Sequence, residues 1–192
     1  MQQQIDWLVP TALPALDGDE DFVGLNAQVI DFWRYAAPDL RTNTVRALLA
    51  EFLVARALGM RATRVEWDDV DLRWEDLAIV VKSAAFLQAW DQRQLARIVF
   101  TGLRGQSWHP RTGYSGVATH RGDVYVFAVQ TSTSHEAYDP LDLRPWRFWV
   151  LPKRTLEDLG ASSISLTAIR ELVDPVALDG LRDAVRRAGT GA

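Results

Sequence analysis

Cysteine is absent from this chain of 192 residues, and histidine and lysine are scarce. The absence of cysteine excludes disulfides, thiolate zinc sites, iron–sulfur clusters and thiol nucleophiles. The three histidines, His109, His120 and His135, show no ligand spacing, so we expect no histidine-rich metal centre. The 21 basic residues include only two lysines, Lys82 and Lys153. In a chain that otherwise uses arginine, a retained lysine points to a position that needs a compact ammonium group.

Long apolar runs are also missing, and none approaches the roughly 20 residues that a transmembrane helix needs. The first basic residue is Arg34, so the N-terminus lacks the positive region of a secretory signal. We therefore expect a cytoplasmic protein with no membrane partner. A net charge of −4 gives the whole chain no general attraction to nucleic acid, but a local basic patch can still bind it.

The hydrophobic pattern predicts an α/β fold with a mixed central sheet flanked by helices. We expect an irregular leader over residues 1–20, a single domain over 21–188 and a frayed tail over 189–192. Helices are predicted at 21–36, 42–59 and 175–188. Two strands are predicted to join near Trp74–Asp76, and the second, LAIVVK (77–82), is apolar enough for a central strand. Further strands are predicted at 97–100, 123–129, 147–151 and 163–166, with a long loop over 101–120.

Three ionisable side chains are predicted to point inward. The helical neighbours of Glu51 are apolar, which places Arg46 and Arg56 on the opposite, wet face. Lys82 ends the apolar strand, and Asp71 lies on the strand before it. Because an unpaired buried charge is costly, we expect Glu51, Asp71 and Lys82 to meet in one cluster.

Each of these residues also has a purely structural interpretation. An inward Glu51 is often a salt-bridge partner, and Asp71 belongs to an acidic run that includes Glu66 and Asp68 and is typical of a solvated face. Lys82 can extend its ammonium group to water from the end of a buried strand. The residues alone leave both interpretations open.

The order Glu51, Asp71, Lys82, followed by VKSAAFLQAW, resembles the PD-(D/E)XK nuclease superfamily. Within it, the chain is most similar to a group of uncharacterised bacterial proteins whose motif strand continues into a similar Ser-Ala-aromatic-Leu-Gln-x-Trp stretch. The resemblance extends over residues 41–170 and includes RGDVYVFAV and YDPLDLRPWRFWVLP. It implies a restriction-endonuclease-like mixed central sheet flanked by helices.

The resemblance also implies roles for five residues. Asp71 would be the metal carboxylate, and the main-chain carbonyl of Val81 a further ligand of Mg²⁺ or Mn²⁺. Lys82 would orient the attacking water and steady charge on the phosphate. Glu51 would match the helix glutamate that supports the metal site. Gln88 would match the glutamine beyond the motif strand, although it can also cap a turn.

One position departs from the family pattern: Val80 stands where the motif has its second acid. Three explanations remain open. A carboxylate from Glu51, Glu75, Asp76 or Asp69 replaces it; the site binds metal weakly and turns over slowly; or catalysis has been lost and the fold serves binding or regulation.

The resemblance thus implies a cytoplasmic, divalent-metal-dependent DNA endonuclease, with a homodimer as one form such enzymes take. The alternative is a catalytically degenerate protein that binds nucleic acid or regulates, and a third possibility is hydrolysis of RNA or another phosphodiester. The loop over 101–121 carries residues able to contact phosphates and stack on bases, although it can equally be an ordinary surface loop. These residues are Arg104, Arg111, Arg121, Trp108, His109 and Tyr114.

Overall fold

The computed structural model describes residues 8, 11, 13–61, 69–109 and 111–191. Most of the first half of the predicted leader and residues 62–68, with Glu66 and Asp68 of the acidic run, lie outside these residues. The chain divides into two compact units, Met1–Pro38 and Asp39–Ala192. No helix in the described part of the chain is long and apolar enough to span a bilayer.

The N-terminal unit contains one short helix, α1 (Val29–Ala36). The backbone N–H of Gln28 donates to the Asp31 carboxylate at 3.0 Å, which fixes the first turn. The helix begins eight residues later than predicted, because the preceding segment forms a turn closed by a bridge between Asp21 and Gln28. Several large apolar side chains of this unit remain exposed: Val23, Leu25, Phe32 and Tyr35.

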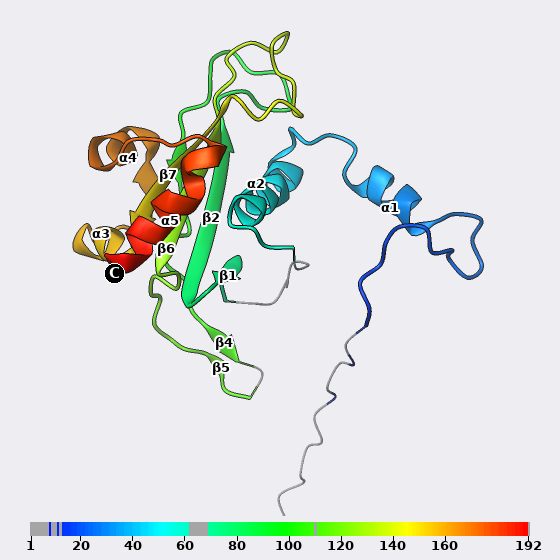
Figure 1. Ribbon diagram of the computed structural model, residues 1–192, viewed down its shortest axis with the longest axis horizontal. Coiled ribbons are helices and arrows are strands. Elements are labelled where there is room, and N and C mark those ends of the chain that lie inside the picture. The colour runs from blue at the N-terminus through cyan, green and yellow to red at the C-terminus, as the bar shows by residue number, and fades with distance from the viewer. Residues whose placement is uncertain (1–7, 9–10, 12, 62–68, 110, 192) are drawn as a thin grey trace, which may run out of the picture. The chain divides into compact units, whose positions relative to one another are not determined.

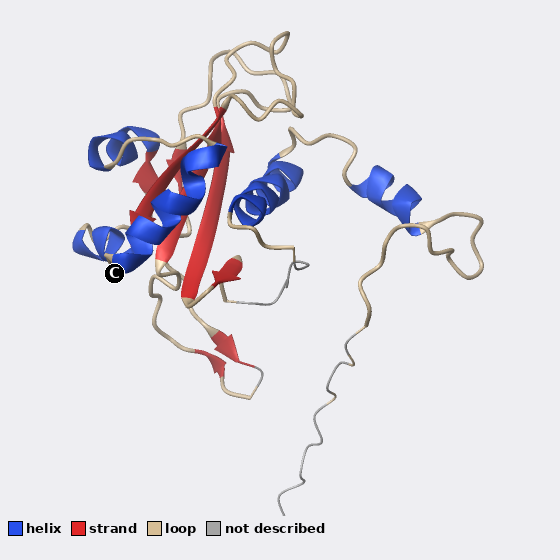
Figure 2. Ribbon diagram, viewed as in Figure 1, coloured by secondary structure: helices blue, strands red, loops and turns tan. Residues whose placement is uncertain are grey.

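A four-stranded mixed sheet forms the centre of the second unit, in the order β1-β2-β6-β7. Its strands are β1 (Leu72–Trp74), β2 (Leu77–Ala85), β6 (Val124–Gln130) and β7 (Trp146–Pro152). β2 is parallel to β6, whereas β1 and β7 are antiparallel to their neighbours. The predicted α/β class (Figure 2) and the central position of β2 are confirmed. Every residue of β6 is buried.

Helices cover both faces of this sheet (Figure 1). One face packs against α2 (Asn43–Ala57) and α5 (Leu181–Thr190), and includes Ile79 and Val81. The other face, which includes Val80, packs against α3 (Lys153–Asp158) and α4 (Leu166–Leu172). Successive residues of a strand point to opposite faces, so the predicted separation of Val80 from Ile79 and Val81 is confirmed.

Short elements complete the second unit. β3 (Val99–Phe100) pairs with β8 (Ile164–Ser165), and β4 (Trp108–His109) with β5 (Gly113–Tyr114). The predicted loop over 101–120 therefore contains a small hairpin. The predicted closing helix is a 3₁₀ turn, η1 (Leu178–Gly180), followed by α5, which runs to Thr190 and into the segment predicted to fray.

The orientation of α2 corrects one prediction. Its buried residues are Arg46, Ala50, Leu53 and Val54, so the centre of the buried face lies near Ala50. Arg46 is only 4% exposed and does not lie on the wet face. Glu51 occupies the flank of the buried face and is half-buried.

Candidate functional site

One pocket of about 510 Å³ brings together the five residues singled out from the sequence. It lies between the first half of α2, the second half of β2 and the segment leading into β3. The lining includes the following residues: Asn43, Arg46, Ala47, Glu51, Asp71, Val81, Lys82, Ser83, Ala84, Ala85, Gln88, Ala96, Arg97, Ile98 and Val99. The predicted convergence on a single pocket is therefore observed, although its chemical role is a separate question.

Asp71 lies beside β2, just before β1 begins. Its backbone N–H donates to the Ile79 carbonyl at 3.1 Å, and its Oδ2 accepts from the Val81 N–H at 2.7 Å. The N–H and C=O of one strand residue point to the same side, so the Val81 carbonyl faces this edge as well. The Asp71 carboxylate and the Val81 carbonyl therefore lie along the same edge of β2.

Lys82 is half-buried and lines two pockets. The second, of about 50 Å³, lies on the Val80 side of β2 and also includes Asp71. Gly102, whose φ is +64°, lies close to the Lys82 ammonium: a Cβ there would be 3.9 Å from Nζ. No carboxylate among the described residues lies within ion-pair distance of Lys82, so the expected contact with Glu51 or Asp71 is not formed.

Gln88 has a structural task in the turn after β2. Its side-chain amide donates to the Ala85 carbonyl at 2.9 Å, and its backbone N–H donates to the Gln92 side chain. The side chain thus caps the turn while it lines the pocket. This geometry agrees with the turn-capping interpretation and leaves the amide oxygen for a ligand.

Val80 is buried in the second core layer, where the motif acid would be. It packs tightly against Gly122, since a Cβ on that glycine would lie 2.8 Å from Val80 Cγ2. Continuing the β1–β2 register places Val80 opposite Asp71. Val80 also lines the 50 Å³ pocket, which is the space where a longer side chain at this position would lie.

The four candidate replacement acids differ in position. Glu51 lines the larger pocket, and Asp69 lines the smaller one, where Arg121 lies 3.6 Å from its carboxylate. Glu75 and Asp76 form the turn at the far end of β2, and neither lines either pocket. Glu75 instead pairs with Arg186 at 3.5 Å. Glu51 and Asp69 are therefore the candidates that remain.

The sequence did not predict four polar residues of the pocket, one of which is Ser83 on β2. Arg46 and Asn43 come from the first turns of α2, and Arg97 from the segment before β3. The signal for Arg46 was its spacing of four residues from Ala50 and eight from Val54, which places all three on one helical face. No pattern in the sequence marks Arg97 as facing the pocket.

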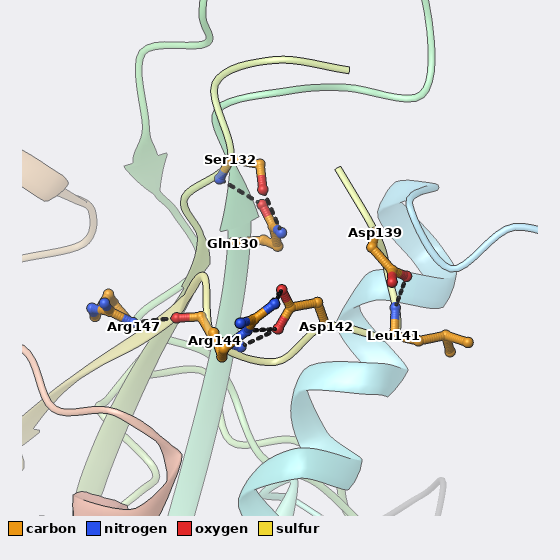
Figure 3. A network of polar contacts seen from close by, with 7 residues as sticks. All are labelled: Gln130, Ser132, Asp139, Leu141, Asp142, Arg144 and Arg147. Carbon is orange, nitrogen blue, oxygen red and sulfur yellow. Dashed lines mark hydrogen bonds and ion pairs between the residues drawn. The ribbon is translucent and has the colours of Figure 1, made fainter. Parts of the chain in front are cut away.

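The loop between β6 and β7 lies near the N-terminal end of α2 and is held by its own polar contacts (Figure 3). Asp142 and Arg144 form a bidentate pair with distances from 2.8 to 3.1 Å. Gln130, at the end of β6, exchanges two hydrogen bonds with Ser132. The same loop carries Tyr138, whose pKa is raised by burial and lowered in part by the charge of Arg46.

The donor set fits a hard divalent cation in type, since it offers the Asp71 and Glu51 carboxylates and the Val81 carbonyl. The fit is incomplete in number, because Val80 supplies no oxygen. Over the described residues, no group of three or more His, Asp or Glu side chains is placed to hold a metal ion. Any cation here would retain several waters, as Mg²⁺ commonly does.

Comparisons of the chain with protein-family models, with curated proteins and with solved structures found no match. The pocket and the residues that line it are therefore the features from which a function can be inferred.

Proposed function

We propose that this protein is a divalent-metal-dependent endonuclease of restriction-endonuclease-like fold, which hydrolyses phosphodiester bonds of DNA. The observation that carries the proposal is the pocket beside β2 that Asp71, Lys82 and Glu51 share. It supports the roles that the family resemblance implies, because the acids and the lysine come from separate elements and face one space. The mixed sheet with helices on both faces agrees with such a fold.

Each residue of the pocket would have a separate role in this reaction. Asp71, Glu51 and the Val81 carbonyl would hold Mg²⁺ or Mn²⁺, which when bound lowers the pKa of water and polarises the phosphoryl oxygen. Lys82 would place its ammonium group beside the phosphate and offset the charge that develops there. The water oxygen forms a new bond to phosphorus, the bond to the leaving oxygen breaks, and the water proton passes through solvent to that oxygen.

A second candidate, a nucleic-acid-binding protein without catalysis, is favoured by two observations. Val80 removes one carboxylate from the motif. The segment 101–121 contains three arginines and no acidic residue, and its β4–β5 hairpin pairs Trp108 with Tyr114, both exposed. Arginines contact phosphates and exposed aromatic rings stack on bases, so this hairpin suits a single strand of nucleic acid.

A cleavage assay on plasmid and single-stranded DNA with Mg²⁺ or Mn²⁺ tests the proposal. We expect cleavage that falls by about 100-fold or more in Lys82→Ala and Asp71→Asn, the loss typical of a catalytic group. Lys153→Ala is the matched control, since Lys153 pairs with Glu157 on α3 at 3.7 Å and lines neither pocket. Cleavage that survives both pocket substitutions would reveal a contaminant or another site.

Titration with Mn²⁺ by calorimetry separates the two candidates. The endonuclease requires saturable binding that Asp71→Asn abolishes. DNA binding without cleavage and without Mn²⁺ binding would overturn it in favour of the second candidate.

A further inference from the structure

Arg46 is a buried cation in the first half of α2. Its side chain is 4% exposed, and no carboxylate among the described residues lies within ion-pair distance of it. Nη1 donates to the Arg41 carbonyl at 2.9 Å and Nη2 to the Asn43 side chain, while buried Nε has no partner. Burial lowers the pKa of this guanidinium. A buried charge with unmet hydrogen bonds is unfavourable, so the position calls for an explanation.

The charges around Arg46 do not supply that explanation. Asp39 is engaged in a bidentate pair with Arg41, with distances of 2.9 and 2.9 Å to Nε and Nη2. Tyr138 is a neutral hydroxyl at neutral pH, because burial raises its pKa. Glu51 lines the same pocket, and the two hydrogen bonds of the Arg46 guanidinium go to Arg41 and Asn43. Within the described ranges, no carboxylate therefore forms an ion pair with Arg46.

The location of Arg46 adds a second source of positive potential. The residue lies in the first turns of α2, a 15-residue helix that begins at Asn43. Its N-cap residue, Thr42, makes no side-chain capping hydrogen bond, and the first turn has no acidic residue. The first N–H groups of a helix lack intrahelical partners and carry partial positive charge. Arg46, Asn43, Lys82 and Arg97 all line the same 510 Å³ pocket.

We propose that Arg46 and the first turn of α2 bind a phosphate group of the nucleic acid strand, next to the phosphate held near Lys82. A guanidinium has five N–H donors, and two hydrogen bonds are formed, so three donors remain for the anion. Its planar fork matches the oxygens of a phosphate. The anion site follows from Arg46 itself, and the identity of the anion as a strand phosphate rests on the proposed function.

NMR of the arginine Nε–Hε groups tests this site in the full chain without divalent metal. The Arg46 resonance is assigned by its loss in Arg46→Lys, and Arg56, exposed on the same helix, is the internal control. We expect inorganic phosphate, and more tightly a short oligothymidylate, to shift the Arg46 resonance saturably. Chloride at equal ionic strength should leave it unchanged. An Arg46 resonance that neither ligand moves would overturn the proposal.

Affinity measurements give a second readout. Arg46→Gln should raise the Kd for the oligonucleotide by about tenfold or more, the effect of losing charge-assisted hydrogen bonds, whereas Arg56→Gln should not. Circular dichroism identifies a variant that does not fold, and the wild-type NMR titration then decides alone. Binding of inorganic phosphate without binding of the oligonucleotide would overturn the assignment to a strand.

Failure of this site and failure of the proposed function remain distinguishable. The phosphate titration uses no metal and detects no cleavage, so it can succeed in a protein that cleaves nothing. Conversely, cleavage that depends on Lys82 and Asp71 but is unchanged in a folded Arg46→Gln would overturn the Arg46 site and leave the nuclease proposal standing.

Discussion

At the scale of single residues, Val80 is the position that departs from the family motif at the proposed metal site. It stands opposite Asp71 and borders a pocket of about 50 Å³, on the same face of β2 as Lys82. This arrangement leaves the proposed metal site one carboxylate short of the family motif while the lysine and the aspartate stay in place. The position therefore offers a direct test of whether a metal site can be completed by one substitution.

Val80→Glu should strengthen Mn²⁺ binding by about tenfold or more, because a second carboxylate beside Asp71 matches the oxygen donors that hard cations select. Calorimetric titration measures the effect. Val80→Gln is the matched control, since it has nearly the same shape without the charge. Equal Mn²⁺ affinity in the two variants would show that residue 80 does not face the cation.

At the scale of elements, the turn before α2 is held by the Asp39–Arg41 pair. The Arg41 guanidinium lowers the pKa of the Asp39 carboxyl below its usual value. Such a group stabilises the folded state above its unfolded-state pKa, and this contribution disappears as the pH falls through the folded-state pKa. Because the Arg41 carbonyl accepts from Arg46, this turn also positions the buried guanidinium.

Asp39→Asn should reduce the free energy of unfolding at neutral pH by less than about 1 kcal/mol, since both side chains are partly exposed. The difference from the wild type should vanish in acid, below the folded-state pKa of Asp39. Urea unfolding at both pH values measures it. A difference that persists at low pH would mean that Asp39 acts through packing or its backbone, not its charge.

The elements also show how far the sequence could be interpreted. Strands β2, β6 and β7 and helix α2 were predicted because long apolar patterns reflect burial that the sheet then imposes. Helices α3 and α4 were missed, since they have six and seven residues and are too short for a clear periodicity. Arg46 was misplaced because arginine is ordinarily exposed, and only tertiary packing shows that its face of α2 is covered.

The candidate site was partly predictable for the same reason. Strand alternation correctly separated Val80 from Val81 and placed Asp71 beside β2. It could not predict that Lys82 forms no ion pair with a described carboxylate, because that depends on side-chain distances across elements. Arg97 could not have been found, since the segment before β3 has no regular structure from which a direction follows.

At the scale of the whole molecule, both core layers come from the second unit. Every residue of the two buried clusters lies beyond Pro38. The pocket, likewise, is lined only by residues 43–99. We therefore expect the sheet and the pocket to form without the first 38 residues.

A variant that begins at Asp39 should fold, with a Tm within a few degrees of that of the full chain. Its near-ultraviolet circular dichroism should retain the signal of the buried Trp146 and Trp149. Thermal unfolding followed at that signal measures the prediction. A non-cooperative transition would show that the N-terminal unit contributes to the core.

Because the chain contains only two lysines, the chemical reactivity of Lys82 can be used to detect ligand binding in the pocket. An amine-reactive reagent can modify two lysine side chains. Lys153 forms an ion pair with Glu157 on α3, whereas Lys82 lines the pocket. Mass spectrometry after mild acetylation therefore measures the extent of acetylation of each lysine separately. An oligonucleotide that binds in the pocket should reduce acetylation of Lys82 and leave acetylation of Lys153 unchanged. The binding site of a ligand can thus be located before any activity is known.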